Sequence, residues 1–180
     1  MKRIILAVLV SLFSIFALIS PAKAAGGPPY YFKWYGNSHW CITDPNDSTT
    51  NGTGAVMEVC NVNTPGQGVT FVKYISSTWF IKTDNGMCIT NNGGNGNPIV
   101  YDACDGNNST QIWAYETDSN GHNFWVNGPL PNDYAIGLRN SDPFAGAVVQ
   151  SENPHWPPLP ADSDQEWCVT DANNQPLVCS

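Results

Sequence analysis

Basic residues are scarce in this chain, and this scarcity limits its partners. The 180 residues include 7 Lys and Arg against 15 Asp and Glu, which gives a formal net charge of −8. Beyond residue 24 the basic residues are Lys33, Lys73, Lys82 and Arg139. A chain this acidic repels phosphate backbones and anionic lipid, so the sequence predicts that nucleic acid is not a partner.

Motifs for metal binding and for nucleophilic catalysis are also missing. The sequence has no Cys-x-x-Cys, and its three histidines stand at no ligand-like spacing to the cysteines. Neither Gly-x-Ser-x-Gly nor His-Glu-x-x-His occurs, and "TDPNDS" at residues 43–48 does not match a calcium loop. The sequence therefore predicts no metal, no cofactor and no enzymatic activity.

Helical periodicity is absent after residue 24, whereas one long apolar run precedes that residue. A basic start, "MKR", is followed by "IILAVLVSLFSIFALIS" and then by "PAKAA", whose small residues suit a signal peptidase. Residues 1–24 are predicted to be a secretory signal peptide; the alternative, a membrane anchor, fits less well because the run is short and lacks basic stop-transfer residues. Residues 25–180 are expected to form one secreted domain, extracellular or periplasmic, with no membrane span.

Short strands separated by turns make up the rest of the sequence. Apolar runs such as "YYFKW", "TFVKYI", "TWFIK" and "NFWVN" are rich in aromatic and β-branched residues. Clusters of Gly, Asn, Asp or Pro divide them, and the chain holds 16 Gly and 14 Pro. This pattern predicts an all-β fold.

A unit of about 47 residues occurs three times in this all-β region. The segments "YFKWYGNSHWCIT", "WFIKTDNGMCIT" and "FWVNGPLPNDYAIGL" each hold an aromatic strand, a polar turn and a second strand, and the intervals Cys41 to Cys88 and Cys88 to Ala135 are both 47 residues. Three units that close around an axis lose most of their exposed strand edges, which predicts a β-trefoil of three four-strand repeats. The predicted repeats span about residues 30–76, 77–121 and 122–180.

The repetition also assigns the six cysteines, whose even number in an exported chain predicts disulfides. Two cysteines occupy equivalent places in each of the first two repeats, so each of these repeats is expected to carry its own bridge. The third repeat has Ala135 and Glu152 at the aligned places, and the last two cysteines flank a terminal hairpin, "VTDANNQPLV". The predicted pairs are Cys41–Cys60, Cys88–Cys104 and Cys168–Cys179.

The complete pattern resembles the repeat of ricin B-chain type lectins. Residues 87–113 show a Cys-Ile-Thr strand, a Gly/Asn turn, an apolar strand ending in Cys, and then Gln-x-Trp. The closing motif recurs in the third repeat, and in the first repeat we interpret "VTF", which ends at Phe71, as its decayed form. The resemblance implies a monomeric β-trefoil with structural rather than ligand-binding roles for Gln111, Trp113, Gln165 and Trp167.

The same resemblance implies where a sugar would bind. Galactose-binding members carry an Asp two residues after the first Cys of a unit, and an aromatic residue two before the second Cys. This chain has Thr43, Thr90 and Gly137 at the first place, and Glu58, Asp102 and Gln150 at the second by alignment.

The third repeat adds a proline-rich loop, "SENPHWPPLPADSDQEW", between its last two strands. Prolines stiffen a loop, which favours presentation of Trp156 to a sugar or a protein; a cap over the open end of the barrel is an equally supported alternative. The carbohydrate-binding candidates are therefore Thr43, Glu58, Thr90, Asp102, Gln150, His155 and Trp156.

The sequence therefore predicts a secreted lectin-like module that binds a cell-surface glycan or a polysaccharide. The alternative is a protein-binding trefoil, such as the receptor-binding subunit of a toxin or a protease inhibitor, in which the sugar pockets have degenerated.

Overall fold

The computed structural model describes residues 29–117, 121, 123–127, 134–153 and 163–179. The predicted signal peptide, residues 1–24, and the candidates His155 and Trp156 lie outside these residues. Within the described ranges, no helix has the length and apolar character that crossing a membrane requires.

Almost all regular elements of the described residues are β-strands. Repeat one contains β1 (Tyr31–Trp34), β2 (Trp40–Thr43), the 3₁₀ turn η1 (Pro45–Asp47), β3 (Thr53–Gly54), β4 (Val56–Val59) and β5 (Val69–Lys73). Repeat two contains β6 (Thr78–Thr83), β7 (Met87–Asn91), β8 (Ile99–Ala103), η2 (Ser109–Gln111) and β9 (Trp113–Thr117). Repeat three contains β10 (Asn123–Asn127), β11 (Tyr134–Leu138), η3 (Arg139–Ser141), β12 (Val149–Glu152), η4 (Ser163–Gln165) and β13 (Trp167–Thr170), and β14 (Pro176–Val178) follows it.

The first and last strands of the repeats form the wall of a barrel. Antiparallel pairing joins β13 to β1, β5 to β6, β6 to β9, and β9 to β10. A bridge between Tyr30 and Val69 links the start of β1 to β5, and β10 lies against β13. The last strand of each repeat therefore pairs with the first strand of the next, which is how the chain closes on itself.

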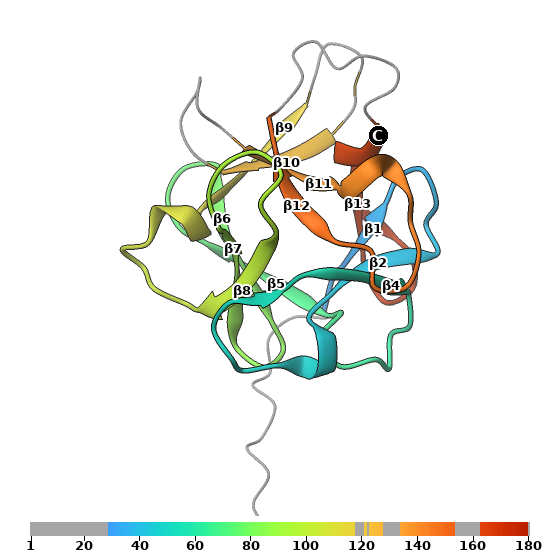
Figure 1. The fold of residues 1–180 in the computed structure, drawn as a ribbon, viewed down its shortest axis with the longest axis horizontal. Helices are drawn as coiled ribbons and strands as arrows, with labels where there is room; N and C mark the ends of the chain where they lie inside the picture. Colours follow the sequence, from blue (N-terminus) through green and yellow to red (C-terminus); the bar gives the residue numbers. More distant parts are fainter. Residues whose placement is uncertain (1–28, 118–120, 122, 128–133, 154–162, 180) are drawn as a thin grey trace, which may run out of the picture.

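The middle strands form three hairpins, β2–β4, β7–β8 and β11–β12, that surround the centre of the view in Figure 1. Main-chain hydrogen bonds join each hairpin to its neighbours: the N–H of Ala55 donates to Ile99 O at 2.8 Å, that of Met57 to Ala147 O at 2.8 Å, and that of Ser151 to Asn97 O at 2.7 Å. Barrel and hairpins together are a β-trefoil, which confirms the predicted fold.

Apolar residues at matched positions of the repeats build one core. Ile42, Ile89 and Ile136 stand 47 residues apart and are each at most 3% exposed. Alternate side chains of a strand face the same side, so one apolar residue at the same place in each repeat is enough to fill a shared layer. The 47-residue interval is thus the distance along the sequence between equivalent core residues of successive repeats.

The three predicted disulfides, Cys41–Cys60, Cys88–Cys104 and Cys168–Cys179, are all present. The register of the hairpins nevertheless corrects the alignment of the third repeat. Cys41 pairs with Glu58, Cys88 with Asp102, and Ala135 with Glu152. Glu152 is therefore the counterpart of Glu58 and Asp102, not of the second cysteines.

Gln150 consequently stands two residues away from the place that the alignment assigned to it. It pairs with Gly137, as Val56 pairs with Thr43 and Val100 with Thr90. A shift of two residues keeps the same side chains on the same face of a strand, so the apolar pattern of the sequence cannot detect it.

In each repeat one glutamine hydrogen-bonds to the main chain at the end of the hairpin. The position of this glutamine in the first repeat corrects the predicted closing motif. Gln67 Oε1 accepts the N–H of Asn61 at 2.8 Å and its Nε2 donates to Val59 O at 3.0 Å. Gln111 makes the same two bonds to Asp105 and Ala103. The first repeat therefore closes with Gln67-Gly68-Val69, in which Val69 replaces the tryptophan, rather than with "VTF".

Phe71, the closing residue that the sequence predicts for the first repeat, instead stacks on Trp125 with ring centroids 5.0 Å apart. A signal in the sequence marked the true position. Gln67 lies seven residues after Cys60, as Gln111 lies seven after Cys104.

Candidate functional site

A concavity of about 680 Å³ lies beside η1 in the first repeat. It brings together two of the predicted residues, Thr43 at the end of β2 and Glu58 on β4. Its lining consists of Thr43, Pro45, Asn46, Asp47, Glu58, Val59, Thr64, Pro65 and Gln67.

Local backbone structure opens this concavity. Pro45 starts η1, and Asn46 and Asp47 both adopt positive φ values, 62° and 51°. These left-handed conformations turn the chain sharply after β2 and present Asp47 to the opening. On the other side, Gln67 holds the loop that follows β4, so the two walls stay apart.

The lining is acidic and contains no aromatic or basic side chain. Glu58 and Asp47 supply carboxylates, and Asp47 Oδ1 is a buried atom to which no residue of the described part of the chain donates a hydrogen bond. Val59, which is 58% exposed, and two prolines supply apolar surface. Ionised carboxylates only accept hydrogen bonds, so this site suits hydroxyl or ammonium donors.

Asp44 lies next to this site and is fully buried at the boundary between repeats one and two. Asn85 Nδ2 donates to Asp44 Oδ2 at 2.9 Å, whereas Asp44 Oδ1 has no hydrogen-bond partner among the described residues. Burial raises the pKa of Asp44, and hydrogen bonds from Asn85 and the Ser48 backbone lower it only in part. Asp47 adds a smaller repulsion that raises the same pKa.

Substitution Asp44→Asn is expected to stabilise the protein at neutral pH by about 1 kcal/mol. Because the pKa of Asp44 is higher in the folded than in the unfolded protein, protonation favours folding. That contribution is present at acidic pH and is lost as the pH rises through the unfolded and then the folded pKa. Repeat two already has a buried asparagine, Asn91, three residues after its first cysteine.

Urea unfolding at neutral and acidic pH measures this effect. The free energy of unfolding of Asp44→Asn should exceed that of the parent protein at neutral pH. Below the ordinary pKa of an aspartate the two free energies should be equal. Asp142→Asn, the same change at an exposed carboxylate, should alter neither value. Lower stability of Asp44→Asn at neutral pH would contradict this prediction. It would mean that the hydrogen bonds to the Asp44 carboxylate outweigh the cost of burying its charge.

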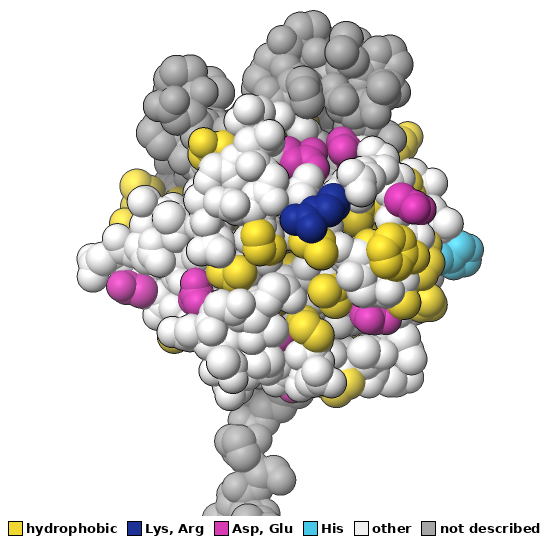
Figure 2. All heavy atoms as spheres, viewed as in Figure 1, with side chains coloured by type: hydrophobic (Ala, Val, Ile, Leu, Met, Phe, Trp, Pro, Cys, Tyr) yellow, Lys and Arg dark blue, Asp and Glu magenta, His cyan; other side chains and the backbone are white. Residues whose placement is uncertain are grey.

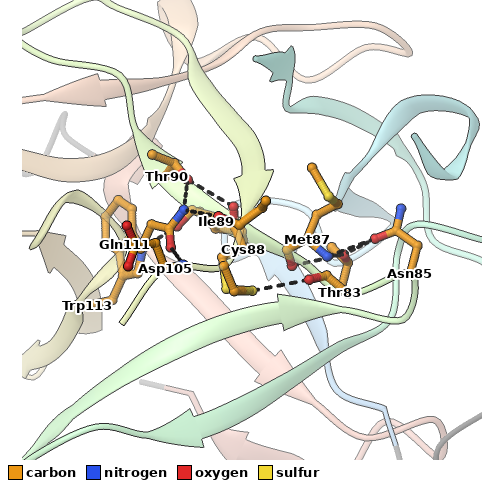
Figure 3. Close-up of a disulfide and its surroundings, with 12 residues drawn as sticks. Thr83, Asn85, Met87, Cys88, Ile89, Thr90, Asp105, Gln111 and Trp113 are labelled. Atoms are coloured by element: carbon orange, nitrogen blue, oxygen red, sulfur yellow. Dashed lines mark hydrogen bonds between the residues drawn. A yellow bond between two sulfur atoms is a disulfide. The ribbon is translucent and has the colours of Figure 1, made fainter. Parts of the chain in front are cut away.

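The second repeat uses the corresponding side chains for its own structure (Figure 3). Thr90 is 4% exposed; its hydroxyl donates to Cys88 O at 3.0 Å and accepts from Gln111 Nε2 at 3.1 Å. Asp102 Oδ1 accepts the N–H of Gly52 at 2.8 Å, which ties this repeat to the loop before β3. Both predicted residues of this repeat therefore have structural partners.

In the third repeat, Glu152 fills the space beside Gly137 that a side chain at position 137 would otherwise occupy. A Cβ atom on Gly137 would lie 2.4 Å from the Glu152 carboxyl carbon, so the missing side chain makes room for this carboxylate. Glu152 is 8% exposed and accepts from Gln150 Nε2 at 2.7 Å and from Gln165 Nε2 at 3.2 Å. Gln150 in turn accepts from Arg139 Nε at 2.8 Å. The predicted residue Gln150 thus belongs to a hydrogen-bonded network.

Charge on the surface agrees with the acidic composition. Figure 2 shows one face, on which acidic side chains are spread widely and basic ones gather at one place. Among the described residues, no group of three His, Cys, Asp or Glu side chains is arranged to hold a metal ion.

No protein-family model and no curated protein matches this chain. Solved structures do share its fold. ThreeFoil, a designed threefold symmetric protein, is 14% identical with a TM-score of 0.65, over 79% of this chain and 98% of that one. The C-half of the earthworm R-type lectin, solved in complex with GalNAc, is 15% identical with a TM-score of 0.58, over 80% and 99%.

A toxin has the same fold as well. Cytolethal distending toxin from Actinobacillus actinomycetemcomitans is 11% identical with a TM-score of 0.62, over 84% of this chain and 94% of that chain. At these identities the similarities establish a shared β-trefoil fold.

Proposed function

We propose that this chain is a secreted carbohydrate-binding module without catalytic activity, and that the concavity of the first repeat is its sugar site. The observation that carries the proposal is that the carboxylates of Asp47 and Glu58 share one opening of about 680 Å³. Thr43 lines the same opening, but it is 3% exposed and its hydroxyl donates to Cys41 O at 3.3 Å, so its role is structural. The fold shared with an R-type lectin that was solved with GalNAc supports it. Three disulfides suit an oxidising, extracellular setting.

The lining selects among sugars by charge. Carboxylates of Asp47 and Glu58 accept hydrogen bonds from hydroxyls or from a protonated amine, and no basic side chain in the lining attracts an acid. Val59 and the prolines contact the C–H face of a sugar in place of an aromatic ring. The expected ligands are therefore neutral or amino sugars, and sialylated or sulfated glycans are expected to be rejected.

A glycan array with the purified protein tests this proposal. Neutral or amino glycans should bind, and Glu58→Ala should weaken the binding at least about tenfold because the main acceptor is lost. Glu116→Ala removes an exposed carboxylate from β9, outside the concavity, and should leave binding unchanged. Binding that survives Glu58→Ala at full strength would overturn this location of the site.

A protein-binding trefoil is the second candidate function, and the similarity to a toxin favours it. An apolar concavity of about 360 Å³ lies near the turn between β5 and β6. Tyr74 and Ile75 line it and are 41% and 63% exposed. An array on which the folded protein binds no glycan would favour this function, with a protein as the partner.

A further inference from the structure

The C-terminal hairpin is an addition to the threefold plan of the molecule. Strand β14 pairs with β13, and Cys168–Cys179 ties the hairpin to the end of the barrel. In the first repeat the chain leads from β5 through residues 74–77 to β6 of the next repeat, without an added hairpin. The barrel closes through the pairing of β13 with β1, and β14 lies on the other edge of β13.

The turn of this hairpin is held in one conformation. Asp171 Oδ1 accepts the N–H groups of Asn173 and Gln175, each at 2.8 Å, and Asn174 has a positive φ of 62°. Asparagine tolerates this left-handed conformation better than most residues. The side chains of Asp171 and Asn174 are therefore presented by a rigid turn.

Comparison of two lysines shows what the hairpin changes. Lys33 and Lys82 occupy the same place in repeats one and two, because each pairs with the first cysteine of its repeat. Lys33 is only 9% exposed, whereas Lys82 is half-buried. The difference is the hairpin: Lys33 Nζ donates to Asn174 Oδ1 from 141 residues away. Burial lowers the pKa of Lys33, and the nearby charge of Asp171 opposes this shift.

An open cleft of about 300 Å³ remains beside this lysine. The residues that line it include the basic Lys33, the acidic Asp171, the amide residues Asn61 and Asn174, and the apolar Val62. Val62 is 52% exposed at the cleft. The loop that follows β4 contributes Asn61 and Val62 here and Thr64 and Pro65 to the concavity of the first repeat, so it separates the two openings.

We propose that this cleft is a second carbohydrate site, created by the C-terminal hairpin, which binds a neutral sugar through two adjacent hydroxyl groups. An ammonium group only donates hydrogen bonds and a carboxylate only accepts them, while a hydroxyl does both. Two neighbouring hydroxyls therefore match Lys33 and Asp171 together, and Val62 contacts the C–H surface of the ring. Asp171 would repel a negatively charged acidic sugar, and Lys33 would repel a positively charged amino sugar.

Backbone-amide NMR spectra of the full protein, titrated with galactose, mannose, N-acetylglucosamine and the acidic sugar glucuronate, test the proposal. At least one neutral sugar should shift the amide signals of Asn61, Val62 and the turn at residues 171–174. Lys33→Met should weaken this binding at least about tenfold, whereas the matched control Lys82→Met should leave it unchanged. Asn174→Gly keeps the positive φ but removes the amide, and it should weaken binding as well.

The outcomes separate this site from the one in the first repeat. Shifts confined to residues 43–47 and 58 would overturn the second site and leave the proposed function intact. Shifts confined to the cleft would support the second site and overturn the location proposed for the first. Equal losses in Lys33→Met and Lys82→Met, or shifts with glucuronate but with no neutral sugar, would also overturn the inference. If Lys33→Met does not fold, Asn174→Gly decides.

Discussion

Replacing Trp113 with alanine is expected to lower the free energy of unfolding by about 4 kcal/mol. Trp113 is 0% exposed, and its indole N–H donates to Ile89 O at 2.9 Å. The substitution leaves a cavity in the core and a buried carbonyl without its partner, and both effects destabilise the folded protein. Urea unfolding followed by intrinsic fluorescence measures the loss.

The first repeat supplies the matched control for this experiment. Val69 occupies the place of Trp113 and is 3% exposed. Val69→Ala removes far fewer buried atoms, so its cost should be about 2 kcal/mol. If the two substitutions cost the same, the tryptophan would not be the larger support of the core that its burial and hydrogen bond indicate.

Removing the bridge Cys88–Cys104 by a double substitution to alanine is expected to cost about 3 kcal/mol, because the bridge limits the conformational entropy of the unfolded chain. The two cysteines are 16 residues apart, and Cys88 is fully buried in the β7–β8 hairpin. For a domain of this size, such a loss lowers the melting temperature by about 10 °C. Calorimetry of the parent protein and the variant measures it.

The bridge Cys168–Cys179 provides the comparison. Its cysteines are 11 residues apart, so loop-closure entropy alone predicts a cost close to that of the other bridge. The hairpin is peripheral, however, and Pro176 and Leu177 of β14 are exposed. Without its bridge the hairpin can open locally while the barrel stays folded, so the global loss should be clearly smaller. Equal losses would show that the hairpin unfolds only together with the barrel.

Repetition in the sequence was enough to predict the architecture. Ile42, Ile89 and Ile136 recur at 47 residues because three equal units share one core layer. The equivalent places of the cysteines in the first two repeats gave two of the bridges, and the two remaining cysteines gave the third. Two details were wrong. Gln150 was placed two residues from the true register, and Phe71 was taken for the closing residue that is in fact Val69. Both errors arose where the marker residues, the second cysteine and the tryptophan, have been replaced.

The sequence by itself determined the three-repeat β fold, the disulfides and the positions of the candidates in the first two repeats on their hairpins, because these depend on spacing along the chain. Only the tertiary structure decided which candidates remain available to a ligand. Asp102, for example, accepts the N–H of Gly52, which is 50 residues away. Whether a polar side chain binds a ligand or its own protein depends on segments that folding brings to it, and spacing along the chain carries no record of those contacts.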